Sequence, residues 1–215
     1  MRTRRLLLAR LAVAGFAALL APGLAGAQQP RASRTPAAPS LSASRSVMAG
    51  SMLSVFLSRM PAGARLAIAR PNDPAASAIV VVEPTTSVPS LQTPGETGNY
   101  ELRLTVQKDG GVPEILLRQP LATTTPSATL AAPVRVGRAQ GLPVRGIGPN
   151  GEQDRVVLVA PDAPADATGP SFYPSENVEA TLEAPDQPGI YELRYVMDAP
   201  LAAHRILARR QITVE

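Results

Sequence analysis

The one histidine of this 215-residue chain, His204, is the first residue to test for catalytic chemistry. Ser-His-Asp or Cys-His catalysis needs an imidazole beside a nucleophile and an orienting acid. His204 falls in Asp198–Arg205, which we expect to be the loop between the last two strands, and no Gly-x-Ser-x-Gly sequence is present. We therefore predict no catalytic role for His204 and no catalytic residue elsewhere in the chain.

Metal-ligating residues are equally scarce. Zinc sites use clusters of His and Cys, and this chain has one His and no Cys. A calcium site needs several convergent oxygen ligands, for which the segment between Asp162 and Asp166 is the best candidate. That segment offers two carboxylates without an EF-hand pattern, so we expect an ordinary polar loop there. The sequence thus predicts no metal site and no cofactor.

An acidic stretch surrounds the expected strand Val178–Leu182. Period-two alternation places Glu179 and Glu183 on an outward face, with Val178 and Leu182 inward. Paired carboxylates that cleave glycosides need a cleft, and an aromatic content of 3% provides few residues that stack on sugars. We interpret the stretch as a solvated strand face. Gly110-Gly111 is typical of a hairpin turn, because no phosphate-loop sequence accompanies it.

Residues 1–27 have the pattern of an export signal. Arg2, Arg4, Arg5 and Arg10 precede an apolar run from Leu11 to Leu20, and Ala25-Gly26-Ala27 matches a small-residue cleavage site. The run is too short for a membrane span, which needs about 20 residues. We expect Sec export, although Arg4-Arg5 also partly matches a twin-arginine signal. The predicted location is the periplasm, the cell surface or the medium.

Cleavage of this signal changes the charge balance. Four of the 21 basic residues lie in it, which leaves 17 basic and 17 acidic residues in the mature chain. A neutral chain has no electrostatic footprint of a nucleic-acid-binding protein. An exported chain with no cysteine must be stabilised by core burial alone, which fits a bacterial protein.

A repeat with an offset of about 90 residues runs through the mature chain. Gly98–Leu104 (GNYELRL) returns as Gly189–Tyr195 (GIYELRY), Arg65–Pro71 corresponds to Arg155–Pro161, and Ile115–Arg118 corresponds to Ile206–Arg209. A unit of this length is a domain rather than a solenoid repeat. We predict a disordered leader over 28–40, a first domain over 41–122, a linker over 123–127 and a second domain over 128–215.

Within each copy the dominant hydrophobic period is two, which is typical of strands with one face in a core. In the first copy we expect an inward face formed by Tyr100, Leu102, Leu104 and Val106 and an outward face formed by Glu101, Arg103, Thr105 and Gln107. In the second copy we expect an inward face formed by Tyr191, Leu193, Tyr195 and Met197 and an outward face that includes Glu192 and Arg194. The 23 prolines argue against long helices. We predict an all-β protein with two tandem immunoglobulin-like antiparallel sandwiches. Further strands are expected at Met52–Leu57, Leu66–Ala69, Ile79–Val82, Val88–Leu91, Ile115–Leu121, Leu142–Arg145, Val156–Ala160, Ser171–Tyr173, Val178–Leu182 and Arg205–Val214.

The Gly-x-Tyr element is the most specific local signal. Immunoglobulin-type sandwiches place a tyrosine near the start of strand F, where its hydroxyl bonds back to the backbone at the preceding corner. Tyr100 and Tyr191 each follow a turn that contains proline and glycine. We predict structural tyrosine corners, the alternative being an exposed aromatic platform for a sugar or a peptide.

Ala184–Val196 (APDQPGIYELRYV), followed by Arg205–Val214 (RILARRQITV), resembles a repeat in exported bacterial proteins. It is similar to tandem immunoglobulin-like modules that often follow a von Willebrand factor A domain, and Thr93–Leu121 is a weaker version. No Asp-x-Ser-x-Ser metal-site motif of the A domain occurs here. The resemblance implies the module fold and brings neither a catalytic residue nor a ligand.

These observations favour a protein that is not an enzyme. We expect a protein–protein interaction, adaptor or structural module of the cell envelope, whose partner is another envelope protein bound through an exposed edge strand or through the groove between domains. The alternatives are a module that binds an envelope polysaccharide and, less favoured, a hydrolase relying on Asp and Glu.

Overall fold

The computed structural model describes residues 38–108 and 110–215. The predicted signal 1–27 and residues 28–37 of the predicted leader lie outside the described residues. Across the described ranges the regular elements are all β-strands, which form four sheets and confirm the all-β prediction. A search of the same residues for a helix able to cross a membrane finds none.

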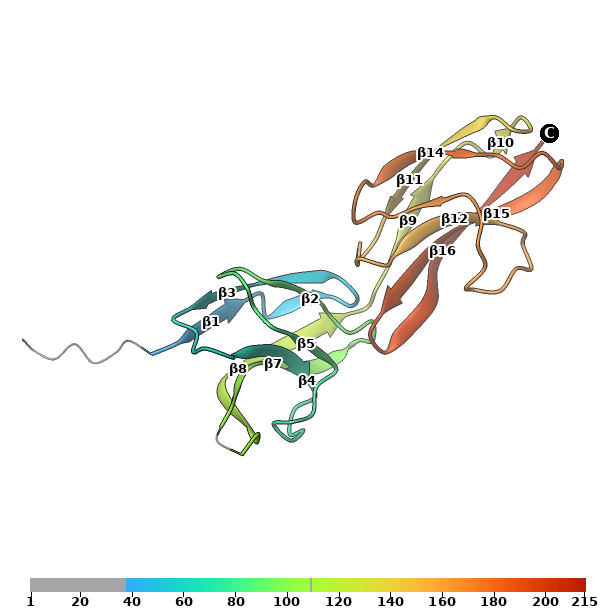
Figure 1. Ribbon diagram of the computed structural model, residues 1–215. Helices are drawn as coiled ribbons and strands as arrows, with labels where there is room; N and C mark the ends of the chain where they lie inside the picture. Colours follow the sequence, from blue (N-terminus) through green and yellow to red (C-terminus); the bar gives the residue numbers. More distant parts are fainter. Residues whose placement is uncertain (1–37, 109) are drawn as a thin grey trace, which may run out of the picture. The chain divides into compact units, whose positions relative to one another are not determined.

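The first copy is built from two facing sheets (Figure 1). A three-stranded sheet has the order β1-β3-β6, and a five-stranded sheet has the order β2-β8-β7-β4-β5. Neighbouring strands are antiparallel except β2 and β8, which are parallel. The strands are β1 (Ser40–Ala43), β2 (Ser46–Met48), β3 (Met52–Ser58), β4 (Arg65–Ala69), β5 (Val80–Val82), β6 (Ser90–Gln92), β7 (Gly98–Gln107) and β8 (Pro113–Thr124).

The second copy repeats this plan. Its three-stranded sheet has the order β14-β11-β9, and its five-stranded sheet has the order β10-β16-β15-β12-β13. Here the parallel pair is β10 and β16. The strands are β9 (Thr129–Ala131), β10 (Arg135–Val136), β11 (Gly141–Ile147), β12 (Arg155–Val159), β13 (Ser171–Phe172), β14 (Glu179–Glu183), β15 (Gly189–Ala199) and β16 (Ala202–Val214).

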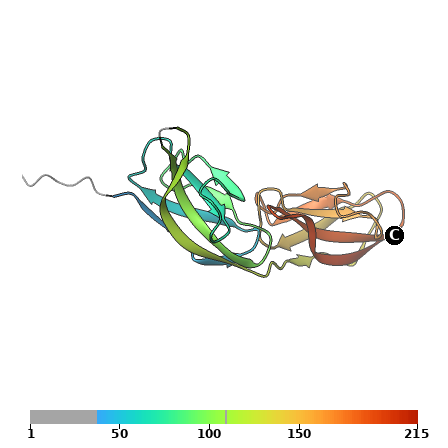
Figure 2. The same ribbon diagram turned by 90° about the horizontal axis from the view of Figure 1, so that it is seen from below.

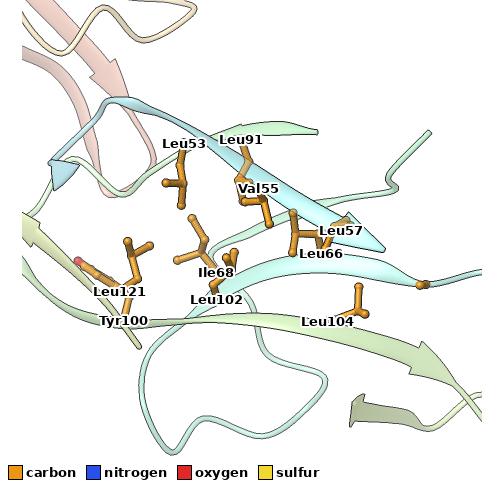
Figure 3. Close-up of a cluster of buried hydrophobic side chains, with 11 residues drawn as sticks. Leu53, Val55, Leu57, Leu66, Ile68, Leu91, Tyr100, Leu102, Leu104 and Leu121 are labelled. Carbon is orange, nitrogen blue, oxygen red and sulfur yellow. The ribbon is translucent and has the colours of Figure 1, made fainter. Parts of the chain in front are cut away.

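Each copy encloses a core of its own between its two sheets. In the first copy Leu53, Val55 and Leu91 of the three-stranded sheet face Ile68 and Leu102 of the five-stranded sheet (Figure 3). In the second copy the corresponding cluster includes Leu142, Val144, Leu158, Leu182, Leu193, Tyr195 and Ile212. The inward positions predicted for Tyr100, Leu102, Leu104, Leu193 and Tyr195 are confirmed, because these residues belong to the two core clusters. Val106 and Tyr191 are partly buried and pack against the same clusters, whereas Met197 is buried but belongs to neither.

Strand pairing shows that the two copies are equivalent residue by residue. Ala67 pairs with Arg103 across β4 and β7, as Val157 pairs with Arg194 across β12 and β15. A register shift follows Leu104 in the first copy and Tyr195 in the second, again 91 residues apart. The sequence repeat is therefore a repeat of three-dimensional structure, down to an irregularity of the ladder.

The β7–β8 hairpin, green in Figures 1 and 2, turns at the predicted glycines. Gly110 and Gly111 have φ angles of 91° and 79°, which a residue without a Cβ adopts at little cost. The Lys108 N–H donates to the Val112 carbonyl and closes the turn at 3.1 Å. The hairpin reading of Gly110-Gly111 is thus confirmed.

Short edge strands account for the elements that the sequence pattern missed. β1, β2, β9 and β10 have two to four residues each, too few to establish a period. β1 begins at Ser40 and β8 continues to Thr124, so described strands reach into both the predicted leader and the predicted linker. Residues 125–128 carry no strand.

Candidate functional site

The outward faces of β7 and β15 differ from the sequence prediction. Arg103 and Arg194 were expected in solvent, but their exposed fractions are 0% and 1%. Thr105, also expected outward, is 7% exposed. The prediction is wrong because the connection after β4 folds back over the outer face of its sheet, as does the connection after β12. Hydrophobic alternation identifies the two faces of a strand but does not report what covers the second one.

In the first copy the Arg103 guanidinium binds this returning connection. It donates from Nη2 to the Arg70 carbonyl at 2.9 Å and from Nη1 to the Pro74 carbonyl at 3.1 Å. Its Nε donates to Glu101 Oε2 at 3.0 Å. A fully buried guanidinium is tolerated only when its donors are bonded and its charge is paired, and these contacts provide both.

Arg194 makes the equivalent contacts in the second copy. Its Nη1 donates to the carbonyls of Ala163 and Pro164 at 2.7 and 3.1 Å. Its Nη2 donates to the Pro161 carbonyl at 2.7 Å, and its Nε bonds to Glu192. We call each arginine with its connection an arginine clamp: Arg103 with residues 70–78, and Arg194 with residues 160–168.

One carboxylate in each copy bridges a buried and an exposed arginine. Glu101 contacts Arg103 and also Arg118, whose side chain is 50% exposed. Glu192 in the same way contacts Arg194 and Arg209, the latter 51% exposed. The alternation placed Arg103 and Arg194 outward. The signal that could have revealed the clamps is a Pro-x-x-Pro segment followed by Glu-x-Arg at nearly the same spacing in both copies.

The candidate calcium segment is part of the second clamp. Asp162 and Asp166 are both exposed, and the carbonyl oxygens of the segment converge on Arg194. The cation held by this loop is therefore a guanidinium supplied by the chain. Among residues 38–108 and 110–215, no group of three or more His, Asp or Glu side chains is arranged to hold a metal ion.

Both tyrosines of the Gly-x-Tyr elements form the predicted corners. The Tyr100 hydroxyl donates to the Glu96 carbonyl at 3.3 Å, and the Tyr191 hydroxyl donates to the Gln187 carbonyl at 3.1 Å. Tyr100 is 5% exposed and belongs to the core. Burial is the main cause that raises the pKa of Tyr100, and the neighbouring Glu96 charge raises it further. These tyrosines are structural.

A buried polar cluster distinguishes the second copy from the first. The Tyr195 hydroxyl donates to Asp154 Oδ2 at 2.9 Å and accepts from the Asn150 N–H at 2.9 Å. Asp154, with 0% exposure, also accepts from the N–H groups of Gly151 and Asp198. Desolvation raises the pKa of Asp154, while the three hydrogen bonds oppose that rise and the Asp198 charge adds to it. Burial also raises the pKa of Tyr195, followed by the charge of Asp154.

This cluster orders the connection between β11 and β12. The first copy has Ala64 and Leu104 where the second has Asp154 and Tyr195, so the cluster is not part of the repeat. Its polar atoms bond to one another and to backbone groups. Its contacts support a structural role.

The remaining sequence candidates lie apart from one another. His204 belongs to β16, beside the β15–β16 turn, so the expected loop Asp198–Arg205 is shorter than predicted. Its Nδ1 lies 3.7 Å from Asp198 Oδ2, and its side chain is 46% exposed. Glu179 and Glu183 are exposed on β14 while Leu182 is buried, which confirms the predicted faces of that strand.

A cleft of about 70 Å³ lies beneath the first arginine-clamp connection, on the outer face of the five-stranded sheet. We call it the β5 cleft. In the second copy larger side chains occupy the same place, where Val157, Val159 and Val196 form a buried cluster. The equivalent residues of the first copy are Ala67, Ala69 and Thr105. The β5 cleft is lined by Ala67, Ala75, Ala76, Ala78, Val81 and Thr105, among others.

Beside this cleft, β5 forms the outer edge of its sheet. One side of β5 pairs with β4, and no described strand pairs with the other side. Val81 is 51% exposed, and the stretch Ala75–Val82 contains neither proline nor charge. The equivalent strand β13 has two residues and is preceded by Pro170, which aligns with Val80 through the strand pairing. β13 is one residue shorter than β5, and the Pro170 carbonyl accepts from the Leu158 N–H, so Pro170 faces β12 and not the free side of β13.

The outer face of the β1-β3-β6 sheet is a second surface of note. Phe56 is 61% exposed and Val88 44%. The carbonyls of Ser87 and Pro89, on either side of Val88, accept from the N–H groups of Leu57 and Val55, on either side of Phe56. Phe56 and Val88 are therefore cross-strand neighbours. We call this surface the serine face, since the residues around the pair are uncharged, many of them serines: Ser40, Ser42, Ser54, Ser58 and Ser90.

No protein-family model matches the chain, and no curated protein matches it. Among solved structures it is similar to fibronectin(III)-like modules of Clostridium thermocellum CbhA, with 13% identity, coverage of 81% of this chain and 93% of that one, and a TM-score of 0.29. It is also similar to the human OSCAR ligand-binding domain, with 17% identity, coverage of 82% of this chain and 98% of that one, and a TM-score of 0.30. For the amphioxus IgVJ-C2 molecule the identity is 12%, the coverage is 78% of this chain and 98% of that one, and the TM-score is 0.27. At values this low, none of the three says what this chain binds; its sandwich architecture follows from the strand order above.

Proposed function

We propose that this chain is a non-catalytic exported bacterial protein that acts as a protein–protein interaction, adaptor or structural module of the cell envelope. The export signal pattern supports a periplasmic or surface location, reached through Sec rather than the twin-arginine route. The resemblance to modules that accompany von Willebrand factor A domains is consistent with such a role. The partner is another envelope protein.

The observation that carries the proposal is the free edge of β5. An unpaired strand edge presents backbone N–H and C=O groups to another extended chain, and an uncharged edge presents them without electrostatic protection. The second copy has Pro170 and Ser171 where β5 has Val80 and Val81. The edge of β5 thus presents the half-exposed apolar side chain of Val81 where the edge of β13 presents a serine.

Affinity capture with the mature chain as bait tests this function. The prey is detergent-solubilised envelope from the bacterium that produces the chain, and bound proteins are identified by mass spectrometry. Val81→Lys adds charge to the free edge and should reduce recovery of a specific protein, whereas Ser171→Lys adds the same charge to the equivalent strand and should not. Absence of any specific protein with wild-type bait would contradict the proposal.

A second candidate, binding of an envelope polysaccharide, is favoured by the serine face. An exposed aromatic ring among hydroxyl groups on a flat sheet can stack on a sugar while the hydroxyls hydrogen-bond to it. Phe56 and the surrounding serines have this arrangement. Binding to a glycan array by the wild-type chain, lost in Phe56→Ser, would establish this function; an array without hits would remove it.

A further inference from the structure

From the difference between the two copies, we infer that β5 and the β5 cleft together form a peptide site. The site takes an extended, uncharged segment of another protein that adds to the edge of β5 and inserts one long apolar side chain into the cleft. This inference rests on the proposed function and specifies its ligand.

The backbone of β5 determines that the ligand is extended. Its free side can satisfy hydrogen bonds to a second chain in the manner of sheet augmentation, where main-chain bonds give affinity and side-chain pockets give specificity. The stretch Ala75–Val82 carries no charge that would repel an incoming strand. Arg65 lines the cleft, but its guanidinium is paired with Glu83 at 2.9 Å within the chain, so no unpaired charge calls for a charged ligand.

The position of the cleft determines the size of the inserted side chain. Val81 and Ala67, which pair across β5 and β4, both line the cleft. An added strand would lie about 4.8 Å beyond β5 and therefore about twice that distance from β4. A side chain must reach past Val81 to enter the space above Ala67, which favours leucine or methionine over alanine or valine.

The volume and lining of the cleft determine its chemistry. A space of about 70 Å³ is large enough for more than one water molecule or for the end of an aliphatic side chain. Four alanines, two valines, Pro113 and the methyl-bearing Thr105 line the cleft together with two longer polar side chains, Arg65 and Gln107. In the second copy the same place is closed by Val157 and Val196. The cleft is thus explained by Ala67 and Thr105, which stand where the second copy has Val157 and Val196.

The probe for this inference is a phage-displayed library of random linear nonapeptides, panned on the mature chain. Enriched sequences should lack charge in their central residues and carry leucine or methionine at one fixed position. A synthetic peptide of the enriched sequence is then titrated against four variants. Absence of enrichment, or enrichment of charged peptides, would overturn the inference.

Two matched pairs of variants separate the edge from the cleft. Val81→Lys should weaken binding by about tenfold or more, while Ser171→Lys on β13 leaves it unchanged. Ala67→Val fills the cleft with the residue found at position 157 and should weaken binding to a similar extent. Thr105→Val keeps the side-chain volume and should have little effect. Unchanged binding in Ala67→Val would overturn the inference even if Val81→Lys is defective.

Two further outcomes keep this test distinct from that of the proposed function. If an envelope protein is captured but its recovery is insensitive to both Val81→Lys and Ala67→Val, the peptide site is wrong and the interaction module stands. If light scattering shows a dimer of the mature chain that Val81→Lys dissociates, the occupant of the edge is a second copy, and the inference is overturned. Circular dichroism melting of every variant verifies that the fold is retained.

Discussion

Arg103 and Arg194 lie 91 residues apart in the sequence and make equivalent contacts in their own copies, each to the carbonyl of a proline four residues beyond the start of its clamp connection. Both are fully buried, and both bond to a glutamate two residues earlier on the same strand. The duplication has therefore preserved a charged contact inside a covered sheet face as well as an apolar core.

Replacement of Arg194 by methionine should lower the free energy of unfolding of the second copy by about 3–5 kcal/mol, because loop carbonyls and Glu192 lose a buried charged partner. Arg209→Met is the matched control, since Arg209 contacts the same Glu192 from an exposed position and its loss should cost less than about 1 kcal/mol. Urea unfolding followed by circular dichroism measures both. Equal losses in the two variants would show that the clamp contributes no more than a surface ion pair.

Removal of the Tyr195 hydroxyl should destabilise the second copy by about 1–3 kcal/mol, because Tyr195→Phe removes one of three hydrogen bonds to the buried Asp154 carboxylate and the hydroxyl that accepts from the Asn150 N–H. Tyr191→Phe removes one bond to a carbonyl that water can reach, so we expect a loss of about 1 kcal/mol or less. Thermal and urea unfolding compare the two variants. A larger loss in Tyr191→Phe would contradict this assignment of roles.

The stability contributed by Asp154 should depend on pH. Because burial raises the pKa of Asp154 in the folded chain above the unfolded value of 3.8, the folded state binds a proton more readily. The stabilisation that results is fully present below the pKa of Asp154 in the unfolded chain, and it is lost as pH rises through the pKa of Asp154 in the folded chain. The stability difference between wild type and Asp154→Asn, measured by urea unfolding, should therefore become less favourable to wild type from pH 4 to pH 7. A difference that is constant, or that increases with pH, would refute the prediction.

Exchange of cleft residues between the copies should change stability to different extents. Val157→Ala removes methyl groups from a filled cluster and should cost about 2 kcal/mol. Ala67→Val adds methyl groups where a cleft of about 70 Å³ already exists, so the free energy of unfolding should change by less than about 1.5 kcal/mol. Calorimetric melting of both variants measures the effects. A strong destabilisation by Ala67→Val would mean that the first copy requires the cleft for its own packing.

The all-β class, the two copies and the inward faces of their long strands could be derived from the sequence. Strands such as Gly98–Gln107 are long enough for a period of two to be legible, and Pro and Gly mark the turns between them. The tyrosine corners were predictable for a related reason, since the hydroxyl of Tyr100 bonds to a residue only four positions earlier. Local patterns determine local contacts.

The buried arginines and the β5 cleft were decided by the tertiary structure. Arg103 has the same place in the alternation as Gln107, yet the first is buried and the second exposed, because residues 70–78 cover one part of the sheet. Likewise the edges of β5 and β13 become comparable only through the pairing of β4 with β5 and of β12 with β13. Coverage and pairing join residues that are distant in the chain, and a periodic pattern within one strand carries no information about them.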